Sequence, residues 1–329
     1  MTGSLPANRA PRLTVLLVTF NHERYVRQAC ESIIRQRLDE PFQVIVADDA
    51  STDATRQVIA ETFARAGERA PPVRFLDHAE TLGITRNYLR GFAACDTEHV
   101  AILEGDDFWI HPEKLARQLD FLDHHWECAA VSANHFIYDE RTSQYTARTQ
   151  ADDGHSYLDA RALIQSNIIG NFSTCMYRTD ALRNMPEQMF RGTVYDWGVN
   201  LCVGRNALIG FLHTPLSVYR LHAGGAWSGL SRAEQIQAQL RVIDHYNNAL
   251  DRVFDAEFQA LRKTLQAAPG LSPRYRPWLP RIGTILLACL PPFIPAALGW
   301  LGRRLAAQAV PPIIPICIRK LRRRRQARS

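Results

Sequence analysis

The chain contains an apolar run that leads directly into three acids: Val100-Ala101-Ile102-Leu103-Glu104-Gly105-Asp106-Asp107-Phe108-Trp109. The apolar half is typical of a buried β-strand. The three carboxylates that follow repel one another, so the cluster is costly unless a cation or a proton relieves it. Mg²⁺ and Mn²⁺ prefer oxygen ligands and keep positions open for phosphate oxygens. The segment therefore predicts a strand that ends at a metal and a phosphate-bearing substrate. A structural alternative remains, because His111-Pro112-Glu113-Lys114 is typical of a helix start.

Strand and helix patterns alternate through the first hundred residues. Apolar runs predict strands at 13–19, 42–47, 73–76 and 100–103, and helical spacing of apolar residues predicts helices at 25–34, 55–66 and 86–94. This alternation predicts an α/β fold with a mostly parallel central sheet flanked by helices. Ligands of such sheets bind beyond the carboxyl ends of the strands. The loops after residues 19, 47 and 103 should therefore share one crevice.

The charge of the chain is divided unevenly. The 329 residues carry a net charge of +6, but residues 281–329 contain ten of the 39 basic residues and none of the 33 acids, which leaves the remainder at −4. This distribution argues against a nucleic-acid partner and for a basic interaction tail. The seven cysteines form no CxxC pair, which indicates free thiols in a reducing compartment.

Five segments, in order, resemble motifs of the family-2 glycosyltransferases, whose fold is the Rossmann-like GT-A fold. They cover roughly residues 13–228: Thr19-Phe20-Asn21-His22-Glu23 with Tyr25, Asp48-Asp49-Ala50-Ser51-Thr52-Asp53-Ala54-Thr55, Glu104-Gly105-Asp106-Asp107-Phe108-Trp109, Tyr195-Asp196-Trp197, and Tyr219-Arg220-Leu221-His222-Ala223-Gly224-Gly225-Ala226-Trp227-Ser228. Taken alone, residues 51–55 are also explained as a helix cap. A dinucleotide oxidoreductase is disfavoured, because no GxGxxG follows the first strand.

The resemblance implies a nucleotide-diphosphate-sugar donor, with a UDP-sugar as the first expectation, and a Mn²⁺ or Mg²⁺ cofactor. Thr19, Phe20 and Glu23 are expected to line the base and ribose pocket, and Asp49 to accept a hydrogen bond from the base. The full set of implied donor contacts is Thr19, Phe20, Asn21, Glu23, Asp48, Asp49, Arg86, Asn87, Glu104, Gly105 and Asp106. The implied metal ligands are Asp106, Asp107 and His222.

The resemblance also implies the catalytic base, Asp196, which would take the proton from an acceptor hydroxyl. One base acting opposite the leaving group predicts inversion of the anomeric centre. Trp197 and Trp227 are expected on the acceptor side, and an N-cap is the structural alternative for Asp196. The expected enzyme builds surface polysaccharide on a saccharide or lipid-linked acceptor. The alternative is a membrane-anchored, non-catalytic glycan-binding or scaffold protein with a degenerate transferase fold.

The predicted domain organisation has four parts: a disordered leader at 1–12, the GT-A catalytic domain at 13–230, a helical region at 231–280, and an apolar, Pro-rich segment with an Arg-rich tail at 281–329. A capping box at Ser231 and Glu234 predicts one long helix through about residue 265. Residues 282–301 carry no charge and are long enough to span a membrane, but three prolines interrupt them. We expect a re-entrant or interfacial anchor on the inner face of the cell membrane, which leaves the enzyme cytoplasmic. A buried C-terminal wrap with a disordered basic end is the alternative.

Overall fold

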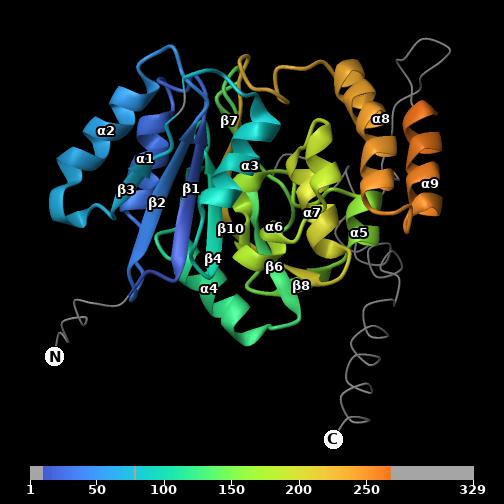
Figure 1. Cartoon of the computed structure of the whole chain (residues 1–329), viewed down its shortest axis with the longest axis horizontal. Coiled ribbons are helices and arrows are strands. Elements are labelled where there is room, and N and C mark those ends of the chain that lie inside the picture. The colour runs from blue at the N-terminus through green and yellow to red at the C-terminus, as the bar shows by residue number, and fades with distance from the viewer. Residues whose placement is uncertain (1–9, 78, 268–329) are drawn as a thin grey trace, which may run out of the picture. The chain divides into compact units, whose positions relative to one another are not determined.

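The computed structural model describes residues 10–77 and 79–267, which form a single mixed sheet covered by helices (Figure 1). The strands are β1 (Leu13–Thr19), β2 (Phe42–Asp48), β3 (Val73–Phe75), β4 (His99–Glu104), β5 (Phe108–Trp109), β6 (Cys128–Asp139), β7 (Gln144–Ala147), β8 (His155–Leu158), β9 (Met176–Arg178) and β10 (Leu208–Leu221). The helices are α1 (Val26–Ile34), α2 (Thr55–Ala66), α3 (Ile84–Ala94), α4 (Lys114–His124), α5 (Ala160–Gln165), α6 (Thr179–Arg183), α7 (Asp196–Gly204), α8 (Arg232–Ala249) and α9 (Asp255–Gln266), with 3-10 turns η1 (Gly67–Arg69), η2 (Phe172–Thr174) and η3 (Glu187–Arg191).

The sheet has the strand order β3-β2-β1-β4-β9-β6-β10-β5, and β7 and β8 pair with β6 and β10. The first four strands of this order are parallel, as the βα alternation predicts, and β6 also runs parallel to β10. β9 enters antiparallel between β4 and β6, and β5, β7 and β8 are antiparallel to their partners. The predicted α/β fold is therefore confirmed, and its second half is mixed rather than parallel.

Opposite faces of the sheet bury different helices. Alternate side chains of β1, Leu13, Val15 and Leu17, join a core cluster with residues of α1, α2 and α4. The intervening Leu16 faces α3, where a Cβ at Gly91 would lie 2.9 Å from the Leu16 Cδ2. This alternation follows from the two-residue period of a strand and lets β1 be buried on both faces.

The boundaries of two predicted segments differ from expectation. The long helix predicted from residue 231 to about 265 is two helices, α8 and α9, because Asp251 and Arg252 adopt positive φ values of 55° and 57° between them. α8 does begin with the predicted capping box of Ser231 and Glu234. Within the predicted leader, the Arg12 guanidinium pairs with Glu98 and Asp123, so ordered structure begins before residue 13.

The predicted membrane-associated segment, 281–329, lies outside the described residues, as do residues 1–9 of the leader. Among the residues that the structure describes, none of the helices is both long enough and apolar enough to cross a membrane.

Candidate functional site

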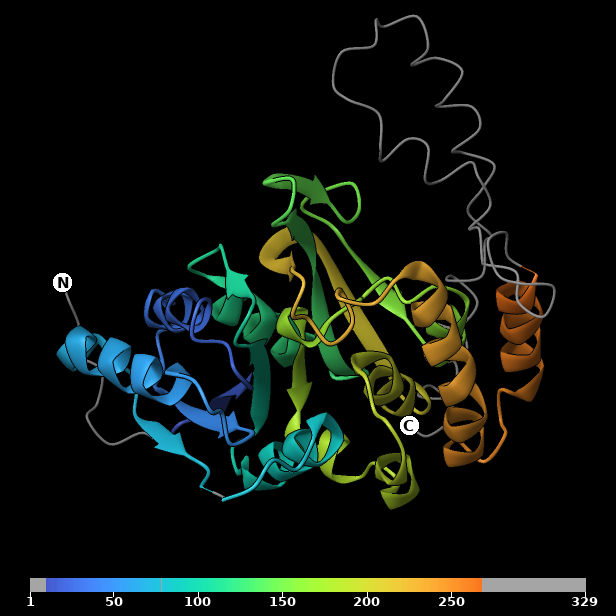
Figure 2. The same ribbon diagram turned by 90° about the horizontal axis from the view of Figure 1, so that it is seen from above.

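The carboxyl ends of β1, β2 and β4 meet at one edge of the sheet, at the top of Figure 1. The register places Thr19 beside Asp48 and Val18 beside Glu104. Figure 2 views this edge from above, with the blue first half of the sheet to the left and the later elements to the right. The loops after these strands therefore share the crevice that the sequence predicts.

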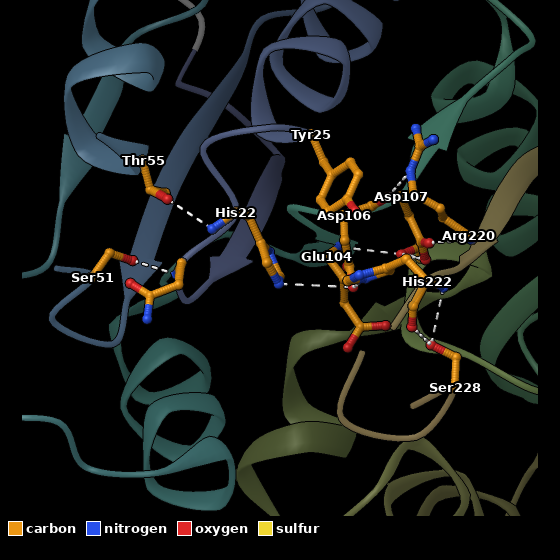
Figure 3. Close-up of polar contacts among 12 residues, drawn as sticks. His22, Tyr25, Ser51, Thr55, Glu104, Asp106, Asp107, Arg220, His222 and Ser228 are labelled. Atoms are coloured by element: carbon orange, nitrogen blue, oxygen red, sulfur yellow. Dashed lines mark hydrogen bonds and ion pairs between the residues drawn. The ribbon is translucent and has the colours of Figure 1, made fainter. Parts of the chain in front are cut away.

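The loop after β1 is held by the loop after β2. The backbone N–H of Asn21 donates to the Ser51 hydroxyl at 2.8 Å, and that of His22 donates to the Thr55 hydroxyl at 2.7 Å (Figure 3). The Asn21 side-chain oxygen accepts from the Thr52 N–H at 2.9 Å, and a Glu23 carboxylate oxygen accepts from the Ala54 N–H at 2.9 Å. Polar residues in 51–55 thus brace the neighbouring loop, in addition to beginning α2.

Several predicted donor contacts have hydrogen-bond partners within the protein. The Asp48 carboxylate is fully buried and accepts the Ser51 N–H at 3.0 Å. The Asp49 carboxylate accepts the backbone N–H groups of Leu82 and Gly83 at 2.8 and 2.9 Å. Asn87 is buried and donates to the Ala47 carbonyl at 2.8 Å, at the end of β2. Asp48, Asp49 and Asn87 thus stabilise the backbone around the end of β2 and the start of α3.

Four of the predicted donor contacts are exposed: Phe20, Asn21, Glu23 and Arg86. Phe20, the first residue after β1, exposes 42% of its surface. Arg86 is exposed, and the part of the chain described here offers it no hydrogen bond or ion pair. Arg86 lines a cavity of about 560 Å³ between the start of α3 and residues 190–193. The Phe20 and Arg86 side chains therefore have surface that a bound ligand could reach.

The first acid of the cluster, Glu104, lies in surroundings that favour its protonated form. Burial, with the charge of Asp106 next, raises the pKa of Glu104 to about 8. The Tyr88 hydroxyl donates to it at 2.7 Å. Its side chain contributes hydrogen bonding to the crevice but little charge.

The third acid, Asp107, points into the protein. One of its oxygens accepts the Ser173 hydroxyl at 2.6 Å and the other accepts the Arg220 N–H at 2.9 Å. Burial raises its pKa well above the usual range. Both oxygens are therefore used to join β10 and η2 to the end of β4, and the predicted role of Asp107 as a metal ligand does not fit this geometry.

The middle acid, Asp106, faces the crevice between two imidazoles (Figure 3). Its Oδ2 lies 3.0 Å from the His222 Nε2 and 3.7 Å from the His22 Nε2. Burial opposes its charged form, but the hydrogen bond with His222 and the nearby His22 outweigh burial and lower its pKa. Burial also lowers the pKa of His22, which keeps this imidazole neutral. Asp106 is thus the carboxylate of the cluster that remains ionised and accessible.

The position of His222 depends on aromatic packing and a closed loop. Its ring lies 4.6 Å from that of Tyr25, centroid to centroid. The Ser228 hydroxyl donates to the His222 carbonyl at 3.1 Å and closes the segment after β10. Arg220, in the same strand, donates from Nε to the Asp106 carbonyl at 2.8 Å and stacks on Tyr25, so it is a structural element of the site.

Asp106 and His222 fit part of a divalent-cation site. Two ligands at adjacent positions of an octahedral ion with bonds of about 2.1 Å lie about 3 Å apart, and the Asp106 and His222 atoms are separated by 3.0 Å. Phosphate oxygens and water would have to supply the remaining ligands. Among the described residues, three ligand atoms from His, Cys, Asp or Glu come within 4.8 Å of one another only at Glu98, His99 and Asp123. Arg12 already binds the two acids of that group.

Asp196, the predicted base, begins α7. Its Oδ2 accepts the Asn167 side-chain N–H at 3.2 Å, and burial raises its pKa. Its charge is one of the smaller causes that raise the pKa of Glu104, after burial and the charge of Asp106. An Asp196 with a raised pKa is a stronger base than a solvated aspartate, which suits the removal of a hydroxyl proton.

The two tryptophans predicted on the acceptor side have different positions. Trp197 is buried, donates its indole N–H to the Leu163 carbonyl at 3.0 Å and packs against Tyr246, which places it in the core. Almost all of α7 after Asp196 is buried, and Trp197 is the first residue of this buried part. Trp227 lies near the crevice residue Tyr195, with ring centroids 5.4 Å apart.

Sequence reasoning missed the roles of His22, Tyr88 and Ser173. His22 lies within a recognised motif, but the sequence does not show that its ring turns toward Asp106. Tyr88 and Ser173 come from α3 and η2, and they reach the acid cluster only through long-range packing. No periodicity or spacing in the sequence relates them to residues 104–107.

Comparison with known proteins agrees with this geometry. The sequence profile described as "Glycosyl transferase family 2" matches residues 14–185. An uncharacterized protein of Mycobacterium tuberculosis is 30% identical over 218 residues, which are 65% of this chain and 60% of that protein. The putative glycosyltransferase EpsE of Bacillus subtilis is 28% identical over 133 residues, covering 40% of this chain and 46% of EpsE. The chain thus spans less than two thirds of these relatives.

Among solved structures, residues 1–349 of S. aureus TarS in complex with UDP-GlcNAc superpose with a TM-score of 0.56 at 20% sequence identity. The match covers 76% of this chain and 70% of that one. At this level of identity the likeness concerns the fold alone.

Proposed function

The chain belongs to glycosyl transferase family 2, and from this premise we propose that it is an inverting, metal-dependent enzyme that uses a nucleotide-diphosphate sugar. The acceptor is a saccharide or a lipid-linked saccharide of a surface polysaccharide. The observation that carries the proposal is the pair formed by Asp106 and His222, 3.0 Å apart in the crevice that also holds Asp196. TarS, which has a similar fold, binds UDP-GlcNAc, and UDP-sugars are therefore the first donors to test.

On the donor side, Asp106 and His222 would hold Mn²⁺ or Mg²⁺ against the diphosphate. A divalent cation, when bound, neutralises the charge that develops on a leaving diphosphate. His22 is neutral and adjacent, so it can donate or accept a hydrogen bond at the phosphate end of the crevice. Phe20, exposed at the mouth, offers an apolar ring to the base.

On the acceptor side, Asp196 would remove the proton from the attacking hydroxyl. Its raised pKa increases its basicity, and the Asn167 amide holds one of its oxygens so that the other can face the acceptor. The hydroxyl then attacks the anomeric carbon on the face opposite the diphosphate, and this single displacement inverts the configuration.

The first experiment is calorimetric titration of UDP into the protein with Mn²⁺ and again with EDTA. We expect binding that needs the metal and that is lost in Asp106→Ala and His222→Ala. His124→Ala is the matched control, because His124 is an exposed histidine of α4 that pairs only locally with Asp120. UDP binding with the same Kd in EDTA would refute the metal-dependent donor site.

Turnover separates the enzyme from a non-catalytic binding protein. Release of UDP from a panel of UDP-sugars should depend on Asp196, and Asp196→Asn should retain UDP binding while losing transfer. NMR of the product anomer tests inversion. If the wild-type protein binds UDP but never turns over a UDP-sugar with any of a panel of glycan acceptors, the non-catalytic alternative gains support.

A further inference from the structure

We propose that the acceptor is anionic and that Arg148 binds its acidic group beside Asp196. This inference rests on the proposed function and specifies the class of acceptor. The acidic group would be a carboxylate, as in a uronic acid, or a phosphate, as in a polyol phosphate. Both groups present a pair of anionic oxygens that a guanidinium fork binds through two hydrogen bonds.

Arg148 and Asp196 are connected through one residue. The Arg148 Nη2 donates to the Asn167 carbonyl at 2.8 Å, and the Asn167 side-chain amide donates to the Asp196 carboxylate at 3.2 Å. Arg148 directly follows β7, and its backbone N–H continues the ladder to β6 by donating to the His135 carbonyl at 3.0 Å. β7 lies at the upper edge in Figure 1, the same edge as the carboxyl ends of β1, β2 and β4.

Arg148 has hydrogen-bond donors that the protein does not use. The described part of the chain gives it one side-chain hydrogen bond, to Asn167, and no carboxylate within ion-pair distance. A guanidinium has five N–H groups, so most of them can bind a ligand. Arg220, the other arginine of the site, differs because its guanidinium already binds the Asp106 carbonyl and the Gln28 side chain.

Arg148 is an exposed residue with protein groups close to its guanidinium. Partial burial lowers its pKa. His135, beside it, is buried, and this burial lowers the pKa of His135 to about 3, so the imidazole adds no charge. At Gly170 a Cβ would lie 3.8 Å from the Arg148 Nε, so the loop backbone passes close to the guanidinium.

The positive charge of Arg148 would offset the repulsion between an acidic acceptor and Asp196. Asp196 must be ionised to act as a base, and a second anion at the same place would be repelled. Arg148 supplies the compensating charge, and through Asn167 it is coupled to the orientation of Asp196. A neutral acceptor needs no such charge. Arg148 has two other possible roles: contact with the donor diphosphate, or bracing of Asn167 alone. Each predicts a different pattern of probe and UDP binding.

The test uses matched pairs of small probes with the full chain in the presence of UDP and Mn²⁺. The pairs are methyl β-D-glucuronide with methyl β-D-glucoside, and ribitol 5-phosphate with ribitol. Saturation-transfer NMR measures binding to the wild type, Arg148→Gln, Arg148→Lys and Arg141→Gln. Arg141 is the control, because it lies on the same hairpin, is exposed and pairs with Asp139.

We expect an acidic probe to bind the wild type about tenfold to a hundredfold more tightly than its neutral partner, the range of a charge-assisted hydrogen bond. Arg148→Gln should abolish this preference, Arg148→Lys should restore part of it, and Arg141→Gln should keep it. A preference for the glucuronide over the glucoside would identify the bound group as a carboxylate. A preference for ribitol 5-phosphate over ribitol would identify it as a phosphate.

Three results would overturn the inference. The first is no preference of the wild type for either acidic probe. The second is a weakened UDP affinity in Arg148→Gln with acidic-probe binding unchanged, which would place Arg148 on the donor. The third is an equal loss for acidic and neutral probes, which would leave only the bracing of Asn167. Failure of the wild type to bind UDP is a separate outcome, because it refutes the proposed function itself.

Discussion

Replacement of Asp107 by alanine should damage stability, whereas the same replacement at Asp106 should damage donor binding. The two acids are adjacent, but their environments are opposite. Asp107 is 1% exposed and accepts hydrogen bonds from the Ser173 hydroxyl and the Arg220 N–H. Asp106 faces the crevice and contacts imidazoles.

The magnitude follows from the two donors that Asp107→Ala leaves without a partner. Each buried unsatisfied donor costs about 1–3 kcal/mol, so the variant should lose about 2–6 kcal/mol of unfolding free energy. In a domain of this size about 1 kcal/mol shifts the Tm by about 2–4 °C, so a decrease of roughly 4–24 °C is expected. Asp106→Ala loses one partly exposed hydrogen bond and relieves charge repulsion, and its Tm should change by no more than about 2–4 °C.

Differential scanning fluorimetry of the two variants, with UDP titrations in Mn²⁺, distinguishes the roles. Asp107→Asn is the informative companion, because it retains one acceptor and should recover part of the lost stability. The reasoning would be refuted if Asp107→Ala had the Tm of the wild type and yet lost metal-dependent UDP binding. That result would make Asp107 a direct ligand.

Three further outcomes are expected. A Cβ at Gly105 would lie 2.8 Å from the Thr19 hydroxyl and 2.9 Å from the His22 Nδ1, so Gly105→Ala should weaken UDP binding by displacing His22; unchanged calorimetric affinity would contradict this. Burial lowers the pKa of Lys114 to about 7, so the native state binds fewer protons than the unfolded state above that pH, and stability should rise from pH 7 toward 10. In urea unfolding, the stability of Lys114→Met should not rise over this pH range, whereas that of the exposed-site control Lys263→Met should. Equal slopes of stability against pH in the two variants would contradict the prediction. Replacing Arg322–Arg325 by glutamine should reduce affinity for phosphatidylcholine vesicles containing phosphatidylglycerol by about two to three orders of magnitude, at about 1 kcal/mol per arginine; flotation that is insensitive to these arginines would count against a basic anchor.

The sequence predicts the first half of the fold well because its elements are local. β1, β2 and β4 are continuous apolar runs, and the helices between them have clear apolar faces, so periodicity identifies each without tertiary information. The carboxyl-edge rule then places the three loops together. The second half is less predictable, because β9 has three residues and its position between β4 and β6 depends on long-range pairing.

The site shows the same limit at the level of side chains. Spacing identifies where acids cluster, but it does not show the direction in which each acid points. Asp107 was expected on the metal and instead joins Ser173 to β10, whereas Trp197 was expected at the acceptor and instead lies in the core. The break between α8 and α9 was missed because the apolar spacing continues through Asp251 and Arg252, and only their positive φ values end the helix.

The repulsion within the acid cluster at residues 104–107 is relieved in three different ways. Burial raises the pKa of Glu104, which accepts from Tyr88, Asp107 is satisfied by two buried donors, and Asp106 faces two imidazoles. In the proposed site a strand end can hold three carboxylates, because only Asp106 would need a cation. His222 reaches this acid from the end of β10, so closure of the segment after β10 would be coupled to completion of the proposed donor site. A loss of order in residues 222–228 should therefore weaken metal-dependent UDP binding without altering Asp106 itself. Replacement of Ser228 by alanine, which removes the hydroxyl that closes this segment, is the smallest change that tests the coupling.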